Sequence, residues 1–224
     1  MSNQVRDREQ YKQLFSSARG DASLLSDTLH VALDIRKFEI DLYWKRAGYF
    51  WTLIGAAFAG YFLLNKADSP FPDSIFVVSC VGFLVSFAWY LVNRGSKYWQ
   101  TNWERHVDLL EDEVVGPLYK TTLAKEEFRL VRLHDGYPFS VSKINQLVSL
   151  YVALVWLGLL IKSAPIVAPC FIEPSLEYWY LGGLTVVFAV LLIWMTASAV
   201  DPRVRNVNFR TSALAPTKED NGDA

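Results

Sequence analysis

The sequence predicts an all-α, polytopic membrane protein with four transmembrane helices, the first two extended into a cytosolic helical bundle. Four windows of the 224-residue chain, 47–65, 74–93, 144–161 and 178–200, contain no ionisable Asp, Glu, Lys, Arg or His residue. Each window is long enough to cross about 30 Å of hydrocarbon as a helix. One such run could be a buried helix of a soluble protein, but four in one short chain favour a membrane.

The basic residues predict the orientation of these helices. Of the 22 Lys and Arg residues, only Lys66 and Lys162 lie in the two loops that would face outward. Positive charge is enriched on the cytoplasmic side of membrane proteins, so both termini and the segment 94–143 are expected to be cytoplasmic. The formal net charge of −1 argues neither for nor against nucleic acid as a partner.

This pattern divides the chain into six regions. They are a flexible N-terminal tail (1–22), a cytosolic helical arm (23–46), transmembrane hairpin 1 (47–93), a cytosolic helical segment (94–143), transmembrane hairpin 2 (144–200) and a disordered C-terminal tail (201–224). Tyr11, Leu14 and Phe15 are the residues of the N-terminal tail that could dock on the rest.

The second crossing is expected to continue as a helix far beyond the membrane. No proline interrupts residues 74–116, which as one helix would be about 60 Å long. Helical spacing places an apolar stripe on one face of its distal half, with acidic and basic residues on the other faces. The stripe consists of Trp99, Trp103, Val107, Leu110 and Val114. Gly116 and Pro117 then end the helix.

The arm before the first crossing also carries apolar residues at helical spacing, among them Leu24, Val31 and Ile35. Packing on the stripe would give an antiparallel pair that extends the first two crossings. The alternative is an amphipathic helix lying on the lipid surface, with Lys37 and Lys45 at the headgroups.

Small residues in the first two crossings predict close helix packing, either between these crossings or between subunits. Gly55 with Ala59 and Ala56 with Gly60 lie four residues apart, as do Gly82 and Ser86. Together with the stripe they are the predicted packing or oligomer interface: Gly55, Ala56, Ala59, Gly60, Gly82, Ser86, Trp99, Trp103, Val107, Leu110 and Val114.

Later segments give fewer signals. A short charged helix is plausible over 118–133, and Ser140 or Ser142 can cap the third crossing. The only cysteines, Cys80 and Cys170, could form a disulfide in an oxidising compartment, but free thiols are the expectation.

Three segments carry a family resemblance. They are Lys37-Phe-Glu-Ile followed by Leu42-Tyr-Trp-Lys-Arg, Asn93-Arg-Gly-Ser-Lys-Tyr-Trp with Asn102-Trp-Glu-Arg-His-Val-Asp, and Tyr137-Pro-Phe-Ser-Val-Ser-Lys-Ile-Asn145. With the general layout, they make roughly residues 30–165 resemble the RipA family of octameric bacterial membrane proteins. The resemblance implies a homo-oligomer, an octamer, in a bacterial cytoplasmic (inner) membrane, and it implies no catalytic residue.

The residues themselves offer little catalytic chemistry. Glu104, Asp108 and Glu111 share a helix face and could hold a cation, although a solvated acidic face is the expected interpretation. Arg129 and His134 match a spacing used by some helical ribonucleases, a match that chance also produces. No hydrolase, kinase or nucleotide-binding motif is present, and we expect no catalytic, cofactor or metal residue.

The preferred prediction is therefore a non-enzymatic homo-oligomer that acts as a membrane scaffold or gated pore. Uncharged crossings disfavour proton-coupled transport, but hydroxyls such as those of Thr52 and Ser79 could line a pore. The alternative is a membrane-disrupting effector of an anti-phage defence system, with an unidentified cytosolic protein or nucleic acid as its trigger. A third hypothesis is a cytosolic-side RNase that uses Arg129 and His134.

Overall fold

Four long helices make up most of the part of the chain that the structure describes. The computed structural model describes residues 4–5, 11, 22–66, 72–119, 121, 137–164, 176–196 and 207–208. The helices are α2 (Ala22–Lys66), α3 (Pro72–Val114), α4 (Val141–Ser163) and α5 (Leu176–Met195), and all four are long and apolar enough to cross a membrane. The all-α class with four spanning helices is thus confirmed. Two residues at each end, β1 (Gln4–Val5) and β2 (Val207–Asn208), pair antiparallel, which the sequence does not predict.

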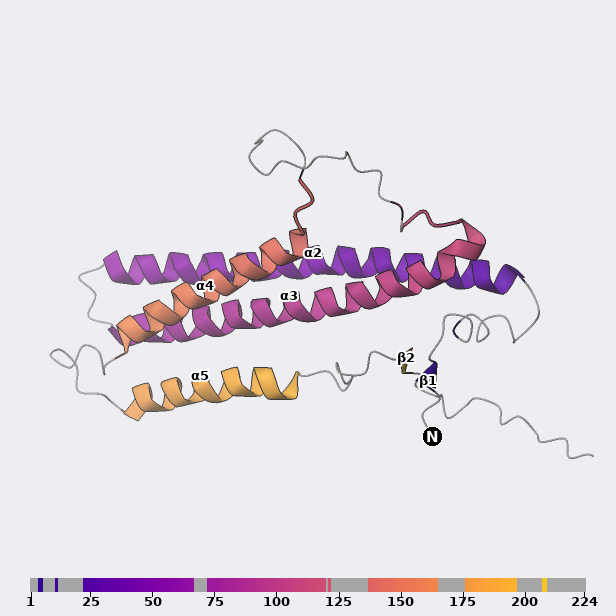
Figure 1. Cartoon of the computed structure of the whole chain (residues 1–224). Helices are drawn as coiled ribbons and strands as arrows, with labels where there is room; N and C mark the ends of the chain where they lie inside the picture. Colours follow the sequence, from indigo (N-terminus) through magenta and orange to yellow (C-terminus); the bar gives the residue numbers. More distant parts are fainter. Residues whose placement is uncertain are drawn as a thin grey trace, which may run out of the picture.

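The long helices α2 and α3 run antiparallel and side by side, as Figure 1 shows. At about 1.5 Å per residue, the 45 residues of α2 and the 43 of α3 each span about 65 Å. This is about twice the thickness of a hydrocarbon core. Helix α4 crosses this pair, and α5 lies along α3 on the other side (Figure 1). Helix α3 packs against each of the other three helices and is the centre of the fold.

The ends of the helices follow the predicted signals. Gly116 has a φ of 75°, and its N–H and that of Val115 both donate to the carbonyl of Glu111, so α3 ends there as predicted. Ser140 is the N-cap of α4, where its hydroxyl accepts the N–H of Lys143 at 3.4 Å. The helix expected over 118–133 lies almost wholly outside the described residues.

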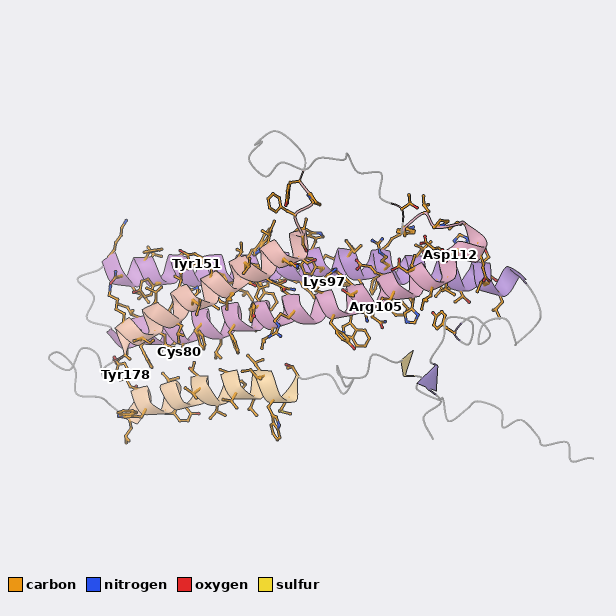
Figure 2. All side chains as sticks on the ribbon, viewed as in Figure 1. Cys80, Lys97, Arg105, Asp112, Tyr151 and Tyr178 are labelled. Carbon is orange, nitrogen blue, oxygen red and sulfur yellow. The ribbon has the colours of Figure 1, made fainter. Side chains whose placement is uncertain are left out.

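Two hydrophobic clusters hold α3 at its two ends. Near its C-terminal end, Val107 and Leu110 pack against Leu29 and Ala32 of α2. Near its N-terminal end, Phe76 and Cys80 pack against Tyr178 of α5, in the region where Figure 2 labels Cys80 and Tyr178. The hydroxyl of Tyr178 also donates to the carboxylate of Asp73. Cys80 is a free thiol, and Cys170 lies outside the described residues.

Candidate functional site

The apolar stripe of α3 packs against the arm of α2 within one chain. Val107 and Leu110 are 0% and 2% exposed, and the partly buried Val114 packs at the edge of their cluster. The prediction that the arm packs on the stripe is thus confirmed for Val107 and Leu110. Because Val107 and Leu110 cluster with residues of α2, their partners come from the same chain.

The two tryptophans of the stripe have different surroundings. Trp99 is 41% exposed, whereas Trp103 is partly buried with its ring centroid 5.2 Å from that of His106. The stripe therefore divides into a covered distal part and an exposed aromatic residue near the membrane boundary. Whether Trp99 contacts another subunit stays a prediction.

Tyr11 links the N-terminal segment to α3. Its side chain is 1% exposed, and its hydroxyl lies 2.5 Å from Nδ1 of His106. His106 is 13 residues beyond Asn93, about 20 Å past the uncharged run, so this contact lies outside the membrane-spanning segment. Burial lowers the pKa of His106 and raises the pKa of Tyr11 to about 12. Both groups are therefore neutral near pH 7, and the imidazole can accept the tyrosine hydroxyl proton in a hydrogen bond. Of the three docking candidates, Leu14 and Phe15 lie outside the described residues.

Two acidic residues of α3 have partners near them in the chain. Glu111 is fully buried, and its carboxylate accepts the backbone N–H of Tyr119 at 2.7 Å. Glu104 pairs with Lys97 at 3.4 Å. Within the described ranges, no group of three or more His, Cys, Asp and Glu side chains is arranged to hold a metal ion. Arg129 and His134, the ribonuclease-like pair, lie outside these ranges.

Polar contacts join α2, α3 and α4 at the boundary where the uncharged windows begin or end. The amide nitrogen of Asn145 donates to the Tyr43 hydroxyl at 2.7 Å, and that of Asn93 donates to the Ser149 hydroxyl at 3.1 Å. Both bonds are buried. The sequence analysis missed this network, although asparagine inside an apolar window is a usable signal, since a buried amide needs a partner.

An aromatic centre within the membrane windows was also missed. The Trp156 ring of α4 is fully buried, and its centroid lies 4.5 Å from Phe58 and 6.0 Å from Tyr61, both on α2. On α3, a Cβ added at Gly82 would lie 2.3 Å from the Trp156 ring. The structure thus places Gly82 against the third crossing, where only a residue without a side chain fits. The neighbouring Ser86 is fully buried.

The small residues of α2 have two different surroundings. Gly60 faces Val78 of α3, whose Cγ1 would lie 3.9 Å from an added Cβ. Around Gly55 there is nothing within 4 Å of such an atom, and Ala56 and Ala59 are exposed. A smooth face of α2 is therefore uncovered in the single chain.

A groove of about 820 Å³ runs along α3 at the end of its uncharged window. The start of α4 and the end of α5 contribute Gln146 and Ile193 to its walls. Three cationic residues, Arg94, Lys97 and Arg105, line it from α3. With its 820 Å³ and its polar and apolar walls, the groove has the size and mixed lining of a ligand site.

Residues 26–165 match the model of a family described as the octameric membrane protein family (8xMP). The match covers α3, α4 and all but the first four residues of α2, including the contacts of Val107 and Leu110 with α2, the polar network and the Trp156 centre. No curated protein and no solved structure matches the chain. The finer assignment to the RipA family stays a prediction. Because the family model matches well over half of the chain and four helices can span a membrane, the chain belongs to the octameric membrane protein family and is a multi-pass membrane protein.

Proposed function

We propose that the chain is one subunit of a homo-octameric scaffold in a cytoplasmic membrane, with no catalytic role. The observation that carries this proposal is the uncovered small-residue face of α2, around Gly55. In lipid, helices gain little from burying apolar side chains and associate mainly where small residues let their backbones approach closely. Because the face around Gly55 is uncovered in the single chain, it supports contact with another copy of the chain.

The family description supports eight copies for this assembly. The strong enrichment of Lys and Arg in 1–46, 94–143 and 201–224 supports cytoplasmic termini, with the extension of α2 and α3 on the cytoplasmic side. In that arrangement the extension of α2 and α3, formed by residues 22–46 and 94–114, lies on the cytoplasmic side of the membrane. The cluster of Leu29, Ala32, Val107 and Leu110 stabilises it.

The experiment compares two glycines in detergent-purified full-length protein by cross-linking and native mass measurement. We expect Gly55→Leu to dissociate the oligomer, because its side chain would hold neighbouring helices apart. Gly158→Leu is the matched control: Gly158 is also exposed, lies in a spanning helix and has nothing within 4 Å of an added Cβ. An unchanged octamer in Gly55→Leu, or a monomeric wild-type protein, would contradict the proposal.

A second candidate is a gated pore between subunits, and one observation favours it. Thr52 lies on α2 one turn from Gly55 and Ala56, and its side chain is exposed within the first uncharged window. In a ring of subunits this hydroxyl could line a passage. Ion flux through liposomes that Thr52→Val reduces would favour the pore, while sealed liposomes containing intact octamers favour the scaffold. Loss of membrane potential on overexpression would instead favour the membrane-disrupting effector.

A further inference from the structure

The groove along α3 spans the end of its uncharged window, where a spanning helix is expected to pass from hydrocarbon to headgroups. Leu91 lines it from the last turn of the uncharged window, and Arg94 follows three residues later. From α5, Ile193 lines the same groove within the fourth uncharged window. One end of the groove is therefore apolar and the other cationic, in the order that a phospholipid presents its acyl chains and headgroup.

The charges at the cationic end are all of one sign. Arg94, Lys97 and Arg105 line the groove, and the described lining includes no aspartate or glutamate. Glu104 pairs with Lys97 at 3.4 Å but is not part of the lining, and Tyr90 lies beneath the Arg94 guanidinium at 5.7 Å. These contacts hold two cations in place at the groove and leave its charge positive.

The cations extend along α3 from the end of the uncharged window. Figure 2 shows Lys97 and Arg105 following one another along α3, past the end of α5. Arg105 is eleven residues after Arg94, about 16 Å along the axis. Helix side chains lean toward the N-terminus of their helix, which for α3 is the membrane, so the long Arg105 side chain can reach back toward the headgroups.

We propose that this groove binds an anionic phospholipid. Its phosphate contacts Arg94 and Lys97, with Arg105 adding positive potential, and its acyl chains lie along Leu91 and Ile193. A soluble phosphate ester would satisfy the same cations but would leave the apolar end without a ligand. The inference rests on the placement of α3 in a membrane and does not depend on subunit number or on a scaffold role.

The test is native mass spectrometry of the full-length protein titrated with phosphatidylglycerol, with phosphatidylcholine of the same acyl chains, and with glycerol 3-phosphate. We expect phosphatidylglycerol to bind at least tenfold more tightly than either of the others. Since each cation near a membrane surface contributes about fivefold to anionic lipid binding, Arg94→Gln should weaken it about fivefold and Arg94→Gln/Arg105→Gln about 25-fold. Arg94→Lys should keep most of the affinity.

The control variant Lys37→Gln/Lys45→Gln also removes two cations, both exposed on α2 and outside the groove. It should change phosphatidylglycerol affinity less than twofold, and all variants should keep the wild-type melting temperature. Equal binding of the two lipids, equally tight glycerol 3-phosphate, or an unchanged groove variant would overturn the proposal. So would a disulfide between copies of a Thr101→Cys variant, because it would place a second chain over the groove.

Discussion

The two halves of the pair of helices α2 and α3 differ in the side chains that they expose. In the extension, formed by 22–46 and 94–114, the buried residues include aliphatic ones such as Leu29 and Leu110, while charged side chains such as Lys37 face outward. In the membrane half, the fully buried positions include Ser79 and Ser86, while many large apolar side chains are exposed. One continuous helix pair thus changes the character of its exposed surface, while its interior contains apolar and polar residues in both halves.

The difference shows which forces hold each half together. Water outside the extension makes the burial of aliphatic side chains favourable. In lipid, burying an apolar side chain gains almost no free energy, so the helices depend on close packing. They also depend on hydrogen bonds to one another, because lipid offers their polar groups no partner. Substitutions that remove volume should therefore do most damage in the extension, and substitutions that add volume should do most damage in the membrane half.

The largest expected effect is the loss of volume in the extension core. Leu110 is 2% exposed between α2 and α3, so Leu110→Ala should lower the free energy of unfolding by about 3 kcal/mol through lost burial and a cavity. Thermal unfolding in detergent, followed by circular dichroism, measures this. Leu118→Ala is the control, since Leu118 is 69% exposed and should change stability by less than about 0.5 kcal/mol. Equal effects of the two variants would mean that the extension is not held by its core.

The second expected effect is added volume in the membrane half. Gly82→Ala should destabilise the protein by about 2 kcal/mol, because its Cβ would meet the buried Trp156 ring at 2.3 Å and force the helices apart. Resistance to unfolding in sodium dodecyl sulfate measures this change. Gly158→Ala, with open space around its Cβ, should be neutral or slightly stabilising. If Trp156→Leu restored no stability to Gly82→Ala, the steric explanation would be wrong.

The halves also differ in how far the sequence predicts them. Helical spacing and the polar faces of the extension placed Val107 and Leu110 against the arm correctly, since water makes the buried face of a helix recognisable. In the membrane windows nearly every residue is apolar, so hydrophobicity does not mark the buried face. The pairing of Gly82 with Trp156 depends on how α4 crosses α3, and a single sequence does not contain that angle. The groove depends in the same way on where α5 lies.

The third prediction concerns the contact between Tyr11 and His106 in the extension. Because burial lowers the pKa of His106, the unfolded chain binds more protons, and acid weakens the folded state as the pH falls below about 6.5. Protonation of Nδ1 also removes the acceptor for Tyr11, so the amide protection factors of the N-terminal segment, which correct for the slower intrinsic exchange at low pH, should fall at pH 5. Tyr11→Phe should cost about 1 kcal/mol at pH 7.5. It should also reduce the difference in protection factor between pH 7.5 and pH 5, and an unchanged difference would show that another group titrates.

The smallest expected effect tests the hydrogen bonds at the boundary between the halves. Asn145 donates to Tyr43 at 2.7 Å, linking α4 to α2, and hydrogen bonds between membrane helices contribute only about 0.6 kcal/mol on average. Asn145→Ala and Tyr43→Phe should each cost about that much, and the double variant should cost little more than either single change, because both remove the same bond. Additive losses would show that the two residues stabilise the protein independently. A loss well above 2 kcal/mol for either would place this boundary among the dominant contacts and contradict the view that close fit, more than hydrogen bonding, holds the membrane half.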